Sequence, residues 1–112
     1  SQVSELVRQW FKQAEYFGAV TNLSSRLETT YLLEGTIGTI HGDYRGQSPQ
    51  AVLEMEFLLL ERTKQARPVF QRRYREEVPL ADEEPGTLVD GWNEALREIL
   101  SELETDVIKS TS

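Results

Sequence analysis

The clearest pattern in this sequence is the alternation of side chains over residues 51–62, which has the period of a β-strand. One face is uniformly apolar and consists of Ala51, Leu53, Met55, Phe57 and Leu59. The other face begins polar and turns apolar at Leu58 and Leu60; it consists of Val52, Glu54, Glu56, Leu58, Leu60 and Arg62. The first face is therefore expected to meet helices, and the second to be covered only near its leucines.

Residues 31–41 predict a second long strand, with an inner face of Tyr31, Leu33, Gly35 and Ile37. Ile40 falls out of phase with that face. An extra residue at Gly38 restores the phase, so we expect a β-bulge near Gly38.

A third long strand is predicted over residues 69–78, where Pro79 ends it, and a short strand over residues 19–22. Arg72 interrupts the inner face of the third strand. A polar loop and a short turn join the long strands, so neighbouring strands are expected to be antiparallel.

Two amphipathic helices are predicted at the ends of the sequence. Residues 3–17 carry an aromatic-rich stripe of Val3, Leu6, Val7, Trp10, Phe11, Ala14 and Phe17. Residues 85–108 keep the helical period from Leu88 to Ile108, and Pro85 suits the first helical position. Both stripes can pack on one face of the sheet, which predicts an α+β two-layer sandwich.

Length and composition limit the number of domains and exclude several classes of function. The 112 residues suffice for one domain, expected to span 1–112. Twelve Lys and Arg against nineteen Asp and Glu give a net charge of −7, which disfavours nucleic acid as a partner. The absence of Cys excludes thiol catalysis, disulfides and Cys-ligated zinc.

No catalytic, cofactor or metal site is predicted. His41 is the one histidine, at the end of a strand, where such a side chain is usually solvated. Glu54 and Glu56 share a strand face at a spacing that could suit an acid/base pair, but neither has an obvious apolar pocket to raise its pKa. We expect a protein that is not an enzyme; the alternative is a small enzyme using Glu54, Glu56 or His41.

Charge is segregated along the chain. Six cations and no acid lie between Arg62 and Arg75, whereas five acids and no cation lie between Glu76 and Glu84. We take the basic stretch and the nearby leucines as a candidate interaction surface for a charged partner or anionic lipid, comprising Leu58, Leu60, Arg62, Arg67, Arg72, Arg73 and Arg75. The alternative is a solvated strand whose arginines pair with neighbouring glutamates.

The order of these segments resembles the ABC-type transport auxiliary lipoproteins of the PqiC/YmbA-like group. The segments that carry the resemblance are Tyr16–Val20, Tyr31–Ile37, Ala51–Leu59, Arg73–Pro79 and Leu88–Leu96. The helix-and-sheet layout is also similar to the TolB amino-terminal domain. The lipid-attachment Cys of the family is absent, which suggests that the chain is a fragment lacking the lipidated amino-terminal part.

The resemblance implies a periplasmic lipoprotein that would be held at the membrane only by a lipid anchor absent from this chain. Its implied role is a docking or adaptor module beside the MCE-type or permease components of a lipid transport system, without catalytic residues. A carrier of lipid or of a small apolar ligand is the alternative function. A fragment of this kind could also form a homo-oligomer through an exposed sheet edge.

Overall fold

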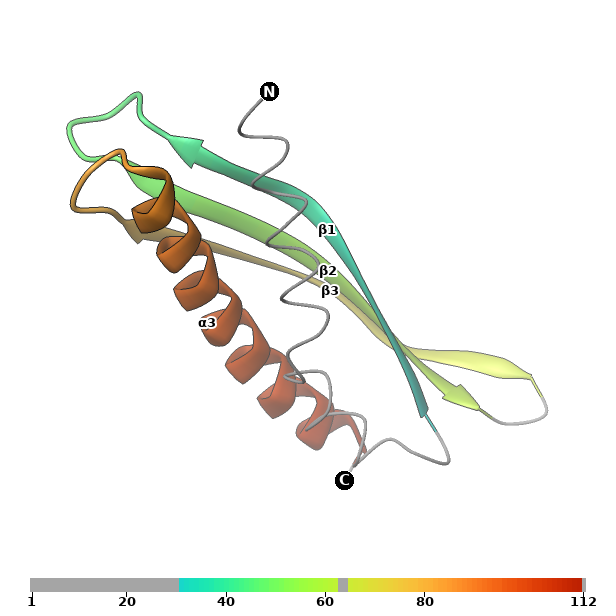
Figure 1. Cartoon of the computed structure of the whole chain (residues 1–112). Coiled ribbons are helices and arrows are strands. Elements are labelled where there is room, and N and C mark those ends of the chain that lie inside the picture. The colour runs from blue at the N-terminus through green and yellow to red at the C-terminus, as the bar shows by residue number, and fades with distance from the viewer. Residues whose placement is uncertain (1–30, 63–64, 112) are drawn as a thin grey trace.

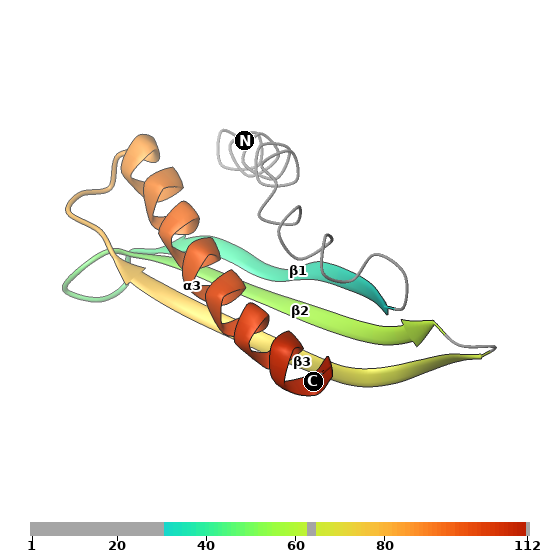
Figure 2. The same ribbon diagram turned by 90° about the horizontal axis from the view of Figure 1, so that it is seen from below.

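The computed structural model describes residues 31–62 and 65–111. Three strands, β1 (Tyr31–Asp43), β2 (Gln50–Arg62) and β3 (Ala66–Pro79), are followed by one helix, α3 (Pro85–Thr111). The strands form an antiparallel meander in the order β1-β2-β3, and α3 crosses one face of it obliquely (Figures 1 and 2). The predicted α+β fold with an antiparallel meander is confirmed.

The predicted amino-terminal helix and the predicted short strand lie outside the described residues. Of the two expected helices, only the carboxyl-terminal one is therefore shown. These predictions concern residues 3–17 and 19–22. Within 31–62 and 65–111, no helix is long and apolar enough to cross a membrane.

The bulge predicted near Gly38 is confirmed, because the register of β1 against β2 shifts between Ile37 and Thr39. A second irregularity, between Leu59 and Leu60, was not predicted. It leaves Val69 without a Cα partner on β2, since Leu59 pairs with Phe70 and Leu60 with Pro68. Both shifts adjust the twist of a sheet whose strands are 13 or 14 residues long.

Several predicted boundaries are wrong, and the largest differences are at the start of the third strand and the end of the helix. The third strand begins at Ala66, because Arg62 pairs with Ala66 directly across the hairpin and Pro68 is tolerated on an edge strand. The third strand also includes Pro79, one residue past its predicted end. The helix runs to Thr111, where the Thr111 hydroxyl donates a 2.8 Å hydrogen bond to the Val107 carbonyl. The first two strands also gain a few residues at the hairpin between them.

The core lies between α3 and the apolar face of β2, as predicted. Trp92, Ala95, Ile99 and Leu103 of α3 are fully buried; from the sheet, the buried side chains in this core are Ala51, Leu53, Phe57, Leu59 and Tyr74. Met55 is only half-buried. We call this covered side of the sheet the inner face, and the opposite side the outer face.

Val52 departs from the expected pattern, since it is fully buried although it lies on the outer face and outside the main core cluster. It pairs with His41 on one side and Glu77 on the other. At Val52, near the β1–β2 hairpin, the outer face is therefore shielded from solvent. Leu58 and Leu60, farther along β2, are only half-buried.

Candidate interaction surface

The structure divides the predicted surface residues between the two faces of the sheet. Leu58 and Leu60 lie on the outer face, and the β2–β3 register brings Arg73 and Arg75 to the same face. Arg72 lies on the inner face, beside α3. The candidate residues therefore do not form one continuous patch, and the outer-face group is treated below as the candidate site.

The remaining two arginines lie near the β2–β3 hairpin. Arg67 forms a 3.3 Å ion pair with Glu61, its register partner on β2. Arg62 is exposed at the end of β2.

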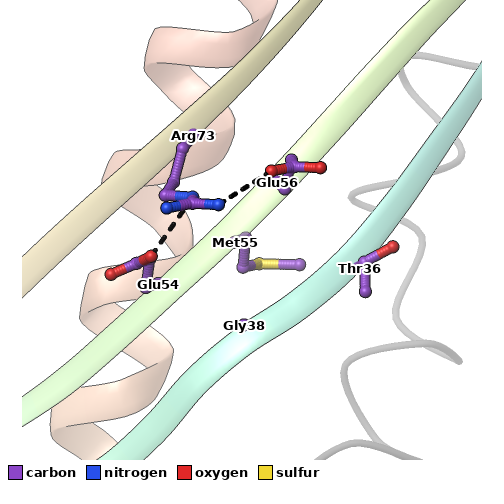
Figure 3. Close-up of a pocket in the computed structure, with 6 residues that line it drawn as sticks. All are labelled: Thr36, Gly38, Glu54, Met55, Glu56 and Arg73. Atoms are coloured by element: carbon purple, nitrogen blue, oxygen red, sulfur yellow. Dashed lines mark hydrogen bonds and ion pairs between the residues drawn. The ribbon is translucent and has the colours of Figure 1, made fainter.

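The middle of the outer face is a network that we call the Arg–Glu ladder, made of Glu54, Glu56, Arg73 and Arg75. The antiparallel register sets Glu54 opposite Arg75 and Glu56 opposite Arg73. Arg73 lies between the two glutamates, with Nε 3.3 Å from Glu54 Oε1 and Nη2 3.2 Å from Glu56 Oε2 (Figure 3). Opposite charges at directly paired positions stabilise the sheet locally.

The ladder extends along β3 in both directions. Arg75 also contacts Glu54 at 3.0 Å and Glu77 at 3.2 Å, while Gln71 donates a 2.7 Å hydrogen bond to Glu56. Because Gln71 and Arg73 both donate to its carboxylate, the pKa of Glu56 lies below its ordinary value. Glu56 is therefore ionised at neutral pH, so it lacks the proton that a general acid would need.

An open pocket of about 270 Å³ lies beside the ladder (Figure 3). Its lining residues come from β1, β2 and β3 and are Thr36, Gly38, Glu54, Met55, Glu56 and Arg73. The pocket was not predicted, although the bulge at Gly38, which was predicted, lies at its wall. Its charged lining groups already pair with one another, so a polar ligand would compete with the Arg73 contacts.

The half-buried leucines lie between the ladder and the β2–β3 hairpin. Leu60 stands between Leu32 and Pro68, and Leu58 stands between Glu34 and Gln71. Leu32 is 38% exposed, which is high for a large apolar side chain. This leucine strip, Leu32, Leu58 and Leu60, gives the outer face an apolar end next to a charged centre.

On the inner face, Arg72 helps to attach the end of α3 to β3. Its guanidinium lies 3.0 Å from Asp106 and stacks 5.1 Å from the centre of the Phe70 ring. The Tyr74 hydroxyl donates a 2.6 Å hydrogen bond to the same carboxylate. The Tyr74 bond, with Arg72 beside it, holds the pKa of Asp106 below its ordinary value. The sequence pattern did not single out Asp106.

The register places His41 on the outer face, as it does Glu54 and Glu56, but among the described residues no hydrogen bond or ion pair joins His41 to either glutamate. His41 pairs with Val52, and its backbone carbonyl accepts a 3.1 Å hydrogen bond from Trp92 Nε1. Glu54 is held by arginines on the other neighbouring strand. In the part of the chain that the structure describes, no group of three or more His, Asp or Glu side chains could hold a metal ion.

No family model and no curated protein sequence matches the chain. Solved structures that share its fold include the following two. Protein XCC0632 from Xanthomonas campestris, a DUF330 protein, superposes with a TM-score of 0.64 at 23% identity, over 71% of this chain and 47% of its own. The hypothetical protein CT253 from Chlamydia trachomatis superposes with a TM-score of 0.55 at 12% identity, over 74% of this chain and 58% of its own.

The likeness defines the chain as an α+β protein with the fold of these two structures. DUF330 is the PqiC/YmbA-like family that the sequence resembles, but no match in sequence confirms membership. The chain spans about half the length of the solved structures that it matches.

Proposed function

We propose that the chain is a non-catalytic docking module of an ABC- or MCE-type lipid transport system in a bacterial envelope. The observation that carries the proposal is the fold shared with a DUF330 protein. It is supported by the segments Tyr31–Ile37, Ala51–Leu59 and Arg73–Pro79, which resemble that family and lie in β1, β2 and β3. The proposed full-length protein is a membrane-anchored lipoprotein that faces the periplasm.

The outer face is the docking surface in this proposal. An interface needs an apolar area that excludes water and a rim of polar groups fixed in position. The leucine strip supplies the first, and the Arg–Glu ladder supplies the second, because its side chains are already held by ion pairs. The partner is expected to be the substrate-carrying or permease component of the transporter.

Capture from solubilised envelope membranes tests the proposal. The chain should retain an MCE-type or permease component, and Leu58→Glu/Leu60→Glu should reduce the amount retained about tenfold or more, since two buried apolar contacts would become charged. The control, Ser101→Glu/Ser110→Glu, adds the same charge at exposed positions of α3 and should retain the component normally. Recovery of no transport component, or equal loss in both variants, would count against the proposal.

The leucine strip also favours a second function, a carrier of lipid or of a small apolar ligand. Half-exposed leucines on an otherwise polar sheet face can hold an acyl chain. Native mass spectrometry after mild extraction should then show a lipid adduct that Leu58→Glu/Leu60→Glu removes. A mass equal to that of the chain alone would argue against this function.

A further inference from the structure

The open pocket beside the Arg–Glu ladder has a lining of mixed charge. Two carboxylates and one guanidinium, from Glu54, Glu56 and Arg73, lie around it, and all six of its lining residues belong to the part of the chain that the structure describes (Figure 3). Thr36 adds a hydroxyl, and Gly38 leaves one wall without a side chain. A volume of about 270 Å³ is small for a drug-sized ligand, so the pocket suits a compact polar group.

The charged groups of this pocket already pair with one another. Arg73 lies 3.3 Å from Glu54 and 3.2 Å from Glu56. A ligand that carried only a negative charge would draw Arg73 away from both carboxylates, and the side chain of Glu54 is only 18% exposed. A ligand that carried only a positive charge would compete with Arg73 for the carboxylates. Either ligand makes one contact and breaks another, and an ion that loses its partner in a shielded position costs free energy.

A ligand that carries both charges replaces each contact that it breaks. Its ammonium group can take the position of Arg73 beside the two carboxylates, while its anionic group accepts hydrogen bonds from the guanidinium. Arg73 is suited to this exchange, because its side chain is 66% exposed and its Nη1 group makes no hydrogen bond to a described residue. The planar fork of a guanidinium matches the oxygens of a phosphate.

The charges around the pocket favour a ligand without net charge. Acids outnumber bases there, because Glu34 and Glu77 add to the two carboxylates of the pocket while Arg75 adds to Arg73. The whole chain also carries a net charge of −7. An anionic ligand is therefore repelled, whereas a zwitterion is not.

The apolar surface next to the pocket indicates what the ligand can be attached to. Leu58 is the next outer-face residue of β2 after Glu56, and Leu60 and Leu32 continue the leucine strip away from the pocket. An acyl chain joined to a group in the pocket can lie along this strip. A zwitterionic phosphate that also carries acyl chains is the headgroup of an aminophospholipid.

We propose that the pocket binds a phosphoethanolamine diester, with its ammonium group against Glu54 and Glu56 and its phosphate against Arg73. This group occurs in a lipid headgroup, whose acyl chains would lie on the leucine strip, and in soluble glycerophosphoethanolamine, which has no acyl chains. The pocket does not depend on the docking function, and the inference rests on the carrier function only for the lipid source.

Glycerophosphoethanolamine tests the pocket by itself. Added to the full chain, it should bind saturably in an NMR titration, with the largest shifts at the lining residues. Glycerophosphoglycerol, which lacks the amine, and ethanolamine, which lacks the phosphate, should each bind at least about tenfold more weakly. Equal binding of glycerophosphoglycerol, or no binding of glycerophosphoethanolamine, would overturn the proposal.

Removal of the guanidinium tests the assigned phosphate contact. Arg73→Gln should raise the Kd for glycerophosphoethanolamine about tenfold or more, and Arg73→Lys, which keeps the charge but not the planar fork, should raise it less. The control is Arg97→Gln, which removes the same charge from an exposed position of α3 and should leave the Kd unchanged. Equal losses in Arg73→Gln and Arg97→Gln would contradict the assigned contact and overturn the proposal.

Gly38→Val tests the pocket without a change of charge. A Cβ at Gly38 would lie 3.7 Å from the backbone oxygen of Glu54 and 3.8 Å from its Oε1, which is ordinary contact, so the strand should tolerate a side chain that fills the pocket. Circular dichroism checks that the fold is kept, and the Kd should rise as it does in Arg73→Gln. Binding that survives in both variants would place the ligand elsewhere and overturn the proposal.

A short-chain lipid distinguishes the two sources of the group. Dihexanoyl phosphatidylethanolamine, below its micelle concentration, should bind more tightly than glycerophosphoethanolamine if the ligand is a lipid. Leu58→Glu/Leu60→Glu should then remove this gain and leave the binding of glycerophosphoethanolamine in place. Equal affinity for the two ligands would assign the pocket to the soluble diester and would count against the carrier function alone.

Discussion

The Tyr74 hydroxyl of β3 donates a 2.6 Å hydrogen bond to Asp106, near the carboxyl-terminal end of α3. Tyr74 is 7% exposed, and burial, together with the carboxylate beside it, raises its pKa. This bond and the neighbouring Arg72 contact join residues 32 and 34 positions apart in the sequence. They fix the far end of the helix on the edge strand of the sheet.

Removal of this anchor should cost stability. Asp106→Ala should lower the free energy of unfolding by about 1–3 kcal/mol, because it leaves the buried Tyr74 hydroxyl without its acceptor. Chemical denaturation monitored by circular dichroism measures the difference.

The control for Asp106→Ala is Thr105→Ala, one residue away, which loses only an exposed hydroxyl bond to Ser101 and should stay within about 0.5 kcal/mol of the parent. The pKa of Asp106 is lowered by folding, so its contribution is present above its ordinary 3.8 and is lost as the pH falls through the folded value. A stability gap that did not shrink in acid would contradict the role of the carboxylate.

The contribution of Glu76 to stability should depend on pH in the opposite way to that of Asp106. Burial, followed by the carboxylates of Glu102 and Glu98, raises its pKa above 4.5. The folded state holds this proton more tightly, so the contribution of Glu76 is favourable below pH 4.5 and is lost as the pH rises through the folded pKa. Glu76→Gln should therefore raise the Tm at neutral pH, with the gain vanishing in acid.

Thermal unfolding across a pH series checks the Glu76 prediction. Glu104→Gln, at an exposed position of α3, removes the same charge and is its control. A gain of the same size in both variants would show that net charge, not the cluster of Glu76, Glu98 and Glu102, is responsible.

Trp92 contributes both packing and a hydrogen bond to β1. It is fully buried in the core, and its indole donates to the His41 carbonyl at 3.1 Å. Trp92→Ala should cost about 3–5 kcal/mol through the cavity it leaves, as should Phe57→Ala. Trp92→Phe also loses the indole N–H but keeps one aromatic ring in the core, so it should cost less, and the difference between the two variants measures packing alone. A small shift in Tm for either alanine variant would contradict the packing described above.

Gly91 lets α3 approach β2 closely. A Cβ at this position would lie 2.7 Å from the Ala51 Cβ and 2.6 Å from a Leu80 methyl, so Gly91→Ala should destabilise by about 1–3 kcal/mol despite the better helix propensity of Ala. A Cβ at Gly86 meets nothing within 4 Å, and Gly86→Ala should be neutral or stabilising. Denaturation curves of the two variants should thus move apart; a shift of both in the same direction would exclude the close approach.

The long strands and the helix were predictable because each has a strict period and one dominant apolar face. Residues 51–62 showed both faces of β2, and the out-of-phase Ile40 was enough to place a bulge. The start of β3 was missed because Pro68 suggests a turn, and only the pairing of Arg62 with Ala66 shows that the ladder continues past it. Local pattern does not report long-range register.

The candidate surface was only partly predictable for the same reason. The run from Arg62 to Arg75 is basic in sequence, but alternation sends Arg72 to one face and Arg73 to the other. Which arginine meets which glutamate depends on the β2–β3 register, which brings Glu54 beside Arg75. The charges were visible in the sequence, but their pairing follows from the register of the β2–β3 hairpin.

The docking role of the outer face is tested most directly by site-specific photo-cross-linking in the envelope. A photoreactive side chain at Leu60, in the leucine strip, should yield adducts with an MCE-type or permease component, while the same group at Ser101, on the exposed side of α3, should yield few. Adducts from Ser101 alone, or none with any transport component from either position, would contradict it.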